Sequence, residues 1–239
     1  MNKNENELEF IKSMRLAMHQ LRAPLTIIKG NLSLMKDELA KNSKIDLKEY
    51  LEEIGIANEK MLDLINALSI ILKLESNDLP VNVQPIDFLS IIEEIINKFE
   101  PKIKKKKINL EKDFSKNLPI INYDSDLIKI IFQNIISNAV NYTPENGKIK
   151  IKIQKQKNDF LIEVSDNGLG IPENQQSKVF TKFFRADNII KENDGAGLGL
   201  YIVKFLIEIF NGKIWFKSEQ NKGTVFSILI PFKIQKGTV

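Results

Sequence analysis

Residues 132–144, FQNIISNAVNYTP, are the stretch of sequence that indicates the fold most clearly. Its apolar residues recur with the period of a helix, and Asn134, Asn138 and Asn141 follow one another at i, i+4 and i+7. The three amides therefore share one face of an otherwise apolar helix, although asparagine is a mediocre helix former. A side-chain carbonyl is a hard oxygen ligand, suited to a Mg²⁺ ion that also holds triphosphate oxygens. The alternative is a solvated stripe in an asparagine-rich chain.

Two glycine clusters follow this helix along the chain. DNGLG, residues 166–170, comes after a strand pattern, and GAGLG, residues 195–199, opens a helix pattern. Glycine permits positive φ and close backbone approach, and a helix N-terminus offers free N–H groups to an anion. The pair suits phosphate binding, although neither cluster matches the GxxxxGK[ST] loop or the strand-GxGxxG order of dinucleotide domains. A pair of simple turns is the alternative.

Around these motifs the pattern mixes helices with strands. Asp124 or Ser125 is the expected cap of the asparagine helix. We predict helices over residues 88–99, 126–141 and 198–210, and strands over 148–154, 160–164, 213–217 and 225–230. Helices over one side of a mixed sheet make an α/β sandwich.

The first 75 residues carry a heptad pattern instead. Apolar residues recur at alternating intervals of three and four over residues 11–39 and again over 47–71. Asp46 and Glu49 form a capping box at the start of the second series. The pattern predicts two long helices packed as in a coiled coil.

A short polar connection at residues 41–44 makes these helices an antiparallel hairpin. The second helix carries a further apolar row at Leu51, Ile65 and Leu72, so its apolar face is wider than a two-helix seam needs. A homodimer, in which two hairpins form a four-helix bundle, would bury the excess.

A break in both patterns separates the two halves of the chain. SNDLP at residues 76–80, followed by Pro85, interrupts the periodicity. We therefore expect an α+β multidomain protein: a helical hairpin over residues 1–76, a linker over 77–84 and an α/β sandwich over 85–239.

The composition excludes several kinds of chemistry. The 239 residues contain no cysteine and one histidine, His19, which rules out disulfides, thiol nucleophiles and multi-histidine metal sites. The net charge of +4 is weak, so no nucleic-acid partner is expected. The densest basic run, residues 102–107, is interpreted as solvated surface, with an anion contact as the alternative. No stretch predicts a membrane span or a signal peptide, and we expect a cytoplasmic chain or the cytoplasmic part of a membrane protein.

Six motifs, in order, resemble those of sensor histidine kinases. The asparagine helix, the DNGLG turn, FTKFFR at residues 180–185 and GAGLGL at 195–200 stand in the order of the family's N, G1, F and G2 boxes. GTVF at residues 223–226 is similar to its final strand, and MHQLRAPL at 18–25 to the H box on the first dimerising helix. The resemblance covers about residues 8–232. It implies a Bergerat-type ATP-binding domain joined to a helical dimerisation and phosphoacceptor domain.

The resemblance also implies roles for single residues. Asp166 would accept a hydrogen bond from the adenine amino group, and Tyr142 would stack near the base. Asn138 would ligate Mg²⁺, with Asn134 beside it. Other motif positions expected to line the nucleotide site are Asn141, Gly168, Gly170, Leu198, Leu200 and Thr224.

The phosphates would be held by backbone under a mobile lid at about residues 184–196. Lys182 and Arg185 would add positive charge there. The glycines that let the backbone reach the phosphates would be Gly195, Gly197 and Gly199.

The implied reaction is attack of His19 on the γ-phosphate of Mg·ATP. The resulting phosphohistidine would pass its phosphoryl group to an aspartate of a response regulator. His19 falls at heptad position b, on the solvent side of the seam, and Pro24 should bend the helix beside it. One alternative is a dimeric module that binds nucleotide or regulator with weak or no kinase activity. Another member of the same ATPase fold is a second alternative, but such proteins lack an H box.

Three positions depart from the family pattern. Gln20 stands where Glu or Asp is usual; it can accept the ring N–H but cannot take the proton, so slower autophosphorylation is expected. Ala23 replaces a Thr, Ser or Asn that helps to place water, which argues against phosphatase activity. Asn141 replaces a Lys or Arg, so we expect weaker ATP binding than with a cation at this position.

Overall fold

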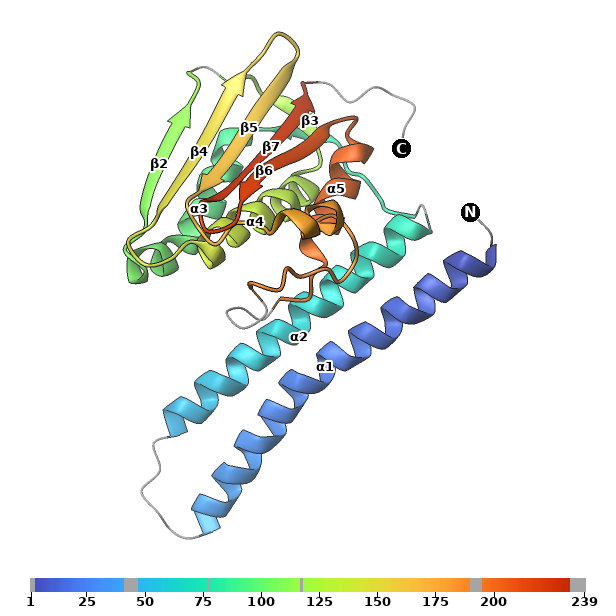
Figure 1. The fold of residues 1–239 in the computed structure, drawn as a ribbon, viewed down its shortest axis with the longest axis vertical. Coiled ribbons are helices and arrows are strands. Elements are labelled where there is room, and N and C mark those ends of the chain that lie inside the picture. Colours follow the sequence, from blue (N-terminus) through green and yellow to red (C-terminus); the bar gives the residue numbers. More distant parts are fainter. Residues whose placement is uncertain (1–2, 41–46, 77, 117, 190–194, 233–239) are drawn as a thin grey trace. The chain divides into compact units, whose positions relative to one another are not determined.

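The computed structural model describes residues 3–40, 47–76, 78–116, 118–189 and 195–232, with side chains from residue 15 onward. The chain divides into two units, Met1–Asn77 with Asp194–Leu198, and Asp78–Asn193 with Gly199–Val239 (Figure 1). None of the helices in the described ranges is long and apolar enough to cross a membrane.

The first unit contains the two predicted long helices, α1 (Lys3–Ala40) and α2 (Leu47–Glu75). Pro24 lies inside α1, and Glu49 lies in the first turn of α2. The predicted connection at 41–44 and the predicted cap Asp46 lie outside the described residues. A polar pair links the helices: the buried Asn31 donates from Nδ2 to Glu53 Oε2 at 2.8 Å.

The apolar stripe of α1 has two sides, and only one is buried. Buried positions recur every seven residues at Ala17, Pro24 and Asn31. A heptad pattern does not tell which half of the stripe finds a partner within the chain, so the packing of the other half stays a prediction for the dimer. The members of the predicted seam that are 46–62% exposed are Met18, Leu25, Leu32 and Leu39.

The second unit is built on a five-stranded sheet with helices on one face (Figure 1). The strand order is β2-β4-β5-β7-β6, in which only the β2–β4 pairing is parallel. These strands are β2 (Asn109–Phe114), β4 (Lys148–Lys155), β5 (Asp159–Asp166), β6 (Lys213–Glu219) and β7 (Gly223–Pro231). A small antiparallel sheet pairs β1 (Gln84–Ile86) with β3 (Ile121–Tyr123).

Three helices cover the sheet: α3 (Phe88–Lys105), α4 (Ser125–Tyr142) and α5 (Gly199–Ile209). Asp87 caps α3 by accepting from the N–H groups of Leu89 and Ser90. Asp124, the first of the two predicted caps, does the same for α4. A short 3₁₀ helix, Glu173–Lys178, follows β5.

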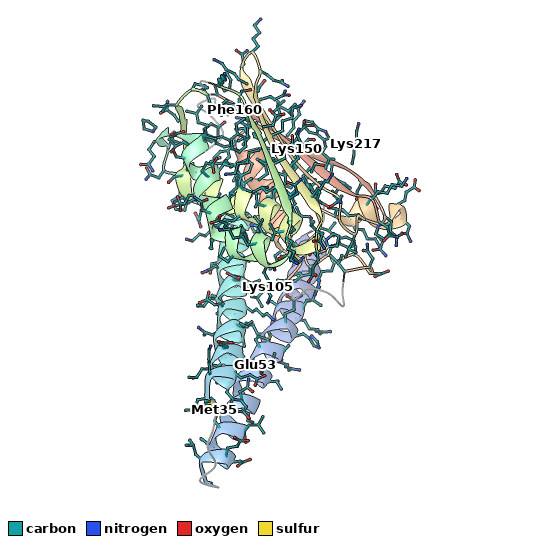
Figure 2. The ribbon with its side chains drawn as sticks, turned by 90° about the vertical axis from the view of Figure 1, so that its left-hand side faces the viewer. Met35, Glu53, Lys105, Lys150, Phe160 and Lys217 are labelled. Carbon is teal, nitrogen blue, oxygen red and sulfur yellow. The ribbon has the colours of Figure 1, made fainter. Side chains whose placement is uncertain are left out.

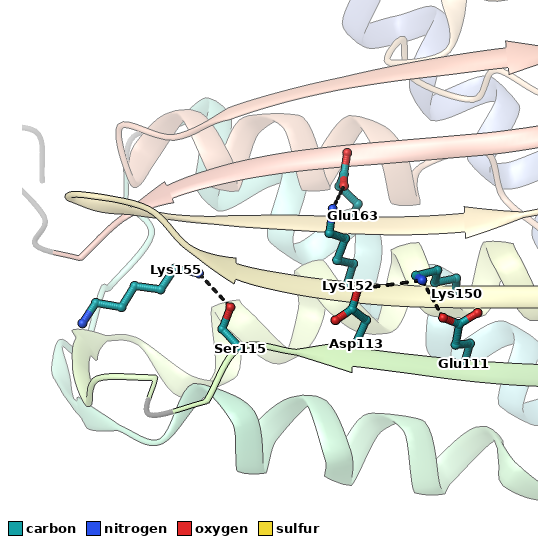
Figure 3. Close-up of polar contacts among 7 residues, drawn as sticks. All are labelled: Glu111, Asp113, Ser115, Lys150, Lys152, Lys155 and Glu163. Carbon is teal, nitrogen blue, oxygen red and sulfur yellow. Dashed lines mark hydrogen bonds and ion pairs between the residues drawn. The ribbon is translucent and has the colours of Figure 1, made fainter.

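The two faces of the sheet differ in chemistry, as the alternating pattern predicts. Residues facing the helices form an apolar core. Phe160, labelled in Figure 2, stacks there on Phe88 with ring centroids 5.2 Å apart. On the other face Lys150 pairs with Glu111 and Asp113, and Lys152 pairs with Glu163 (Figure 3). The charged face of the sheet is solvated, and the apolar core lies between the other face and the helices.

The predicted helices and strands of this unit are confirmed, most of them longer than expected. The fold class, a helical region followed by an α/β sandwich, is confirmed with them. The elements that the sequence did not predict are short or lie at the sheet edge: β1, β2, β3 and the 3₁₀ helix.

Candidate active site

The asparagine stripe lies on α4, where the sequence predicts it. Asn134, Asn138 and Asn141 are all half-buried. Asn134 donates from Nδ2 to the Ile130 carbonyl at 2.8 Å, which turns its Oδ1 toward the first residue of α5. A Cβ on Gly199 would collide with that oxygen. A side chain at position 199 would therefore force the Asn134 amide to move.

Asp166 ends β5 with its carboxylate largely withdrawn from water. Its Oδ1 accepts hydrogen bonds from the N–H groups of Gly168 at 2.9 Å and Thr224 at 3.3 Å. Burial raises the pKa of Asp166 to about 6, although both hydrogen bonds favour the ionised form. At neutral pH this group is a fixed, partly desolvated acceptor, which suits an exocyclic amino group.

The glycine turn after Asp166 packs against the end of α4. Leu169 donates its N–H to the Tyr142 carbonyl at 3.3 Å, and a Cβ on Gly168 would collide with the same carbonyl. Gly170 has a φ of 59°, which glycine adopts without strain. Burial raises the pKa of the Tyr142 phenol, and the charge of Arg185 opposes that rise. Tyr142, Asp166 and Gly168 therefore form one corner of the site.

Thr224 reaches this corner through its backbone. Its own hydroxyl lies 2.8 Å from Ser218 Oγ, and Ser218 Oγ also accepts from Ile171 N–H at 2.8 Å. Ser218 thus ties the strand hairpin to the glycine turn. No motif marks a serine in β6, so the sequence does not predict this role of Ser218.

The segment 180–189 is held by contacts of its own. Lys182 Nζ lies 5.2 Å from the centroid of the Tyr201 ring, and Arg185 donates from Nη2 to the Ile189 carbonyl at 3.2 Å. Asn188, a second missed residue, donates from Nδ2 to the carbonyls of Leu169 and Gly170. The predicted phosphate contacts of Lys182 and Arg185 stay predictions.

The second glycine cluster is split between the two units. Gly199 and the half-buried Leu200 begin α5 in the sandwich unit. Gly195, Gly197 and Leu198 belong to the other unit; Gly197 has a φ of 68°. The lid residues 190–194 lie outside the described residues, so the lid also stays a prediction.

His19 and Gln20 lie on α1. The His19 side chain is exposed, as heptad position b predicts, and Gln20 beside it is half-buried. The exposed imidazole is therefore open to a reacting group brought from outside the hairpin.

The metal prediction depends on Asn138. Within the described residues, no group of three or more His, Asp or Glu side chains could hold a metal ion. The Asn138 side chain makes no hydrogen bond to another described residue, so its amide oxygen is available as a ligand. One protein oxygen fits a Mg²⁺ ion that takes its other ligands from phosphates and water.

Comparison with known proteins agrees with this arrangement. Residues 12–77 match the family model described as His Kinase A (phospho-acceptor) domain. Residues 123–234 match the model described as Histidine kinase-, DNA gyrase B-, and HSP90-like ATPase. The fold and the site therefore define a phosphoacceptor helical hairpin joined to an ATPase domain of this type.

Individual relatives show which family of these ATPases the chain is similar to. The sensor protein kinase WalK of Staphylococcus aureus is 30% identical over 219 residues, which cover 90% of this chain and 52% of one WalK sequence. The chain thus spans about half the length of that relative, and 36% of other WalK sequences. The catalytic domain of the histidine kinase ThkA is 32% identical, with a TM-score of 0.58 over 65% of this chain and 99% of that domain. The chain belongs to the sensor histidine kinase family.

Two further structures extend the likeness to both units. ThkA in complex with the response regulator protein TrrA is 28% identical, with a TM-score of 0.70 over 98% of this chain and 66% of that chain. The Acinetobacter baumannii histidine kinase AdeS, at 24% identity and a TM-score of 0.72, covers 90% of this chain and 98% of its own, and shares the fold.

Proposed function

We propose that the chain is an ATP-dependent protein-histidine kinase that phosphorylates itself on His19. The observation that carries the proposal is the corner formed by Asp166, Gly168 and Tyr142 at the end of α4. Here the half-buried carboxylate of Asp166 lies at the glycine turn that packs on the Tyr142 carbonyl, and Asn134 of the same helix lies against Gly199 at the N-terminus of α5. Residues 12–77 match the phospho-acceptor family model, which supports His19 as the residue that is phosphorylated.

The corner supplies the base-binding part of the site. The ionised Asp166 accepts from the adenine amino group, while the hydrogen bonds from Gly168 and Thr224 keep its carboxylate oriented. Tyr142 offers a ring face at the same end of α4. A pocket of this kind selects adenine over a base that carries a carbonyl at that position, because a carbonyl would meet the carboxylate without a proton between them.

The phosphates follow α4 away from this corner. Asn138 is the proposed Mg²⁺ ligand, and the ion would neutralise charge on the phosphate oxygens. The N-terminus of α5 at Gly199 faces Asn134 and offers backbone N–H groups to an anion. The other residues that the family motifs imply for phosphate contact are Gly195, Gly197, Leu198, Leu200, Lys182 and Arg185.

The phosphoryl transfer is a nucleophilic displacement. A ring nitrogen of His19 attacks the γ-phosphorus, the bond to the bridging oxygen breaks, and ADP leaves. Gln20 accepts the N–H of the other ring nitrogen and orients the imidazole, but it cannot remove the proton. The phosphoryl group then moves to an aspartate of a response regulator, and the complex of ThkA with TrrA supports such a partner.

A homodimer through α1 and α2 is part of the proposal. Both helices expose large apolar side chains in a stripe beside the buried one. The further row of α2, Leu51, Ile65 and Leu72, is 45–56% exposed. A second hairpin would cover these residues in a four-helix bundle. Since ATP is an intracellular substrate, we also propose a cytoplasmic location for both units.

A dimeric binding module with weak kinase activity is the second candidate. Gln20 in place of an acid, and Asn141 in place of a cation, favour it. Ala23 further favours a protein without phosphatase activity.

Labelled ATP separates the two candidates. The purified chain with Mg²⁺ should take up label from γ-labelled ATP and none from α-labelled ATP, and Asn138→Ala should reduce uptake at least tenfold. Binding of ATP with no uptake of label from γ-labelled ATP would establish the binding module instead.

A further inference from the structure

The lysine run at the end of α3 is not uniformly solvated surface. Lys104 pairs with Glu100 on the exposed side of the helix. Lys106 turns toward α4 and donates from Nζ to the carbonyls of Val140, Asn141 and Thr143 at 3.0, 2.8 and 2.6 Å. Such an ammonium satisfies the last carbonyls of α4 and opposes the negative end of its dipole. Lys106 therefore has a structural role.

Lys102, one turn earlier on the same face of α3, makes a different contact. Its Nζ donates to Asn141 Oδ1, and Asn141 in turn donates from Nδ2 to Ser137 Oγ at 3.2 Å. The ammonium group of Lys102, on α3, therefore lies at the end of the asparagine stripe of α4. Within the described residues, Lys102 forms no ion pair with a carboxylate.

The surroundings of Lys102 favour an anion. The Lys102 side chain is exposed, but partial desolvation lowers its pKa, and the charge of the nearby Lys105 lowers it further. An ammonium that has lost part of its hydration, beside another cation and without an acid, gains when a negatively charged group approaches.

The position along α4 indicates which anion. Tyr142 marks the base end of the proposed nucleotide path, and Asn134, facing Gly199, marks the phosphate end. At a helical rise of 1.5 Å per residue these ends lie about 12 Å apart. Asn141 lies close to the base end, so Lys102 is nearer to the first phosphates after the ribose than to the terminal one.

We propose that Lys102 binds the α- or β-phosphate of the adenine nucleotide and supplies, from α3, the positive charge that α4 lacks at Asn141. The inference rests on the proposed nucleotide site. It makes Lys102 a ligand-binding residue outside the family's motifs, with equal importance for ATP and ADP and none for adenosine.

The test compares three ligands on matched variants. Isothermal titration gives the affinities for ATP and ADP, and protein-observed NMR titration gives the weaker affinity for adenosine. Lys102→Gln should bind both ATP and ADP about tenfold more weakly, which corresponds to about 1.4 kcal/mol. Adenosine affinity should not change.

Two further variants serve as controls. Lys102→Arg keeps the charge and should bind within about threefold of the unchanged protein. Lys98→Gln removes one charge from an exposed position one turn earlier on α3 and should have no effect. Thermal unfolding of each variant reports whether α3 and α4 remain folded.

The results distinguish the inference from the site on which it rests. An equal loss for adenosine and ADP would show that Lys102 acts on the fold of the α4 end, and would overturn the inference. Unchanged ADP affinity in Lys102→Gln would also overturn it, while leaving the nucleotide site intact. Absence of ATP and ADP binding by the unchanged protein would overturn the proposed function itself.

Discussion

The amide oxygen of Asn134 occupies the space that a Cβ on Gly199 would need. The contact brings the asparagine helix α4 against the N-terminus of α5. Because α5 begins at this glycine, the free N–H groups of its first turn lie beside the amide stripe. The glycine therefore has a packing role as well as a place in the proposed phosphate-binding turn.

Gly199→Ala should displace the Asn134 amide and weaken both folding and ligand binding. We expect a loss of about 1–3 kcal/mol in the free energy of unfolding of the sandwich unit, since the added methyl must displace Asn134. Denaturant titration followed by circular dichroism measures it. The double variant Gly199→Ala with Asn134→Ala removes the collision and should recover part of the stability. A single variant as stable as the unchanged protein would mean that the contact is not close.

Asp166 predicts a pH dependence of adenosine binding. Its raised pKa of about 6 means that the carboxylate needed to accept the amino hydrogen bond is lost as the pH falls through 6. Adenosine affinity should therefore rise from pH 5 to pH 7 and then level off; adenosine has no phosphate that titrates in this range. In Asp166→Asn the profile should be flat. A profile of the unchanged protein that is flat between pH 5 and 7 would contradict this role.

The same pKa predicts a stability effect of opposite sense. Between the usual aspartate pKa of 3.8 and about 6, the folded protein keeps a proton that the unfolded chain has released, so ionising Asp166 destabilises the fold. The part of the stability that depends on Asp166 is present below pH 4 and is lost as the pH rises through 6. Asp166→Asn should therefore raise the thermal midpoint at pH 7.5 relative to the unchanged protein, and should raise it less at pH 5. A midpoint lowered at pH 7.5 would show that the charge stabilises the fold.

Gln20→Glu should accelerate autophosphorylation at least tenfold, because general-base catalysis contributes about 10²–10⁴ where the base is well placed. The initial rate of label uptake at saturating ATP measures this effect. Gln20→Leu, which keeps a similar volume but cannot accept a hydrogen bond, should be slower than the unchanged protein. An unchanged or lower rate for Gln20→Glu would show that position 20 does not act on the imidazole.

Asn141→Lys tests whether a cation at position 141 and Lys102 bind the same phosphate group. In the Lys102→Gln background the new ammonium should restore ADP affinity to about that of the unchanged protein. In the unchanged background the gain should be smaller, because two ammonium groups would meet at one place. Equal gains in the two backgrounds would mean that the two positions act independently.

Much of the fold can be predicted from the sequence where local pattern and tertiary contact agree. The strands β4 and β5 alternate apolar and polar residues because one face meets the helices and the other carries ion pairs such as Lys152 with Glu163. Strand β2 was missed since it is an edge strand with few inward positions, and its parallel partner β4 comes 34 residues after its last residue. Pairing over such a distance leaves no local signal.

The candidate site shows a similar division. The residues of motifs were found because several backbone constraints coincide there, as at Gly168 against the Tyr142 carbonyl. Asn188 and Ser218 were missed, since no motif marks an asparagine in the lid segment or a serine in β6. The run that contains Lys102 was interpreted as solvated surface, with an anion contact as the alternative. The spacing of Lys102 and Lys106, four residues apart on a helix, is a signal that separates these two lysines from their neighbours.

Autophosphorylation of His19 is tested most directly by finding the residue to which the phosphoryl group is attached. His19 is the only histidine of the chain, so a phosphohistidine can form at one position. The chain is incubated with γ-labelled ATP and Mg²⁺, and the label is examined for acid lability in the unchanged protein and in His19→Ala. The account predicts acid-labile label that is lost in His19→Ala, although that variant still binds ATP. Label that survives acid, or that persists in His19→Ala, would contradict it.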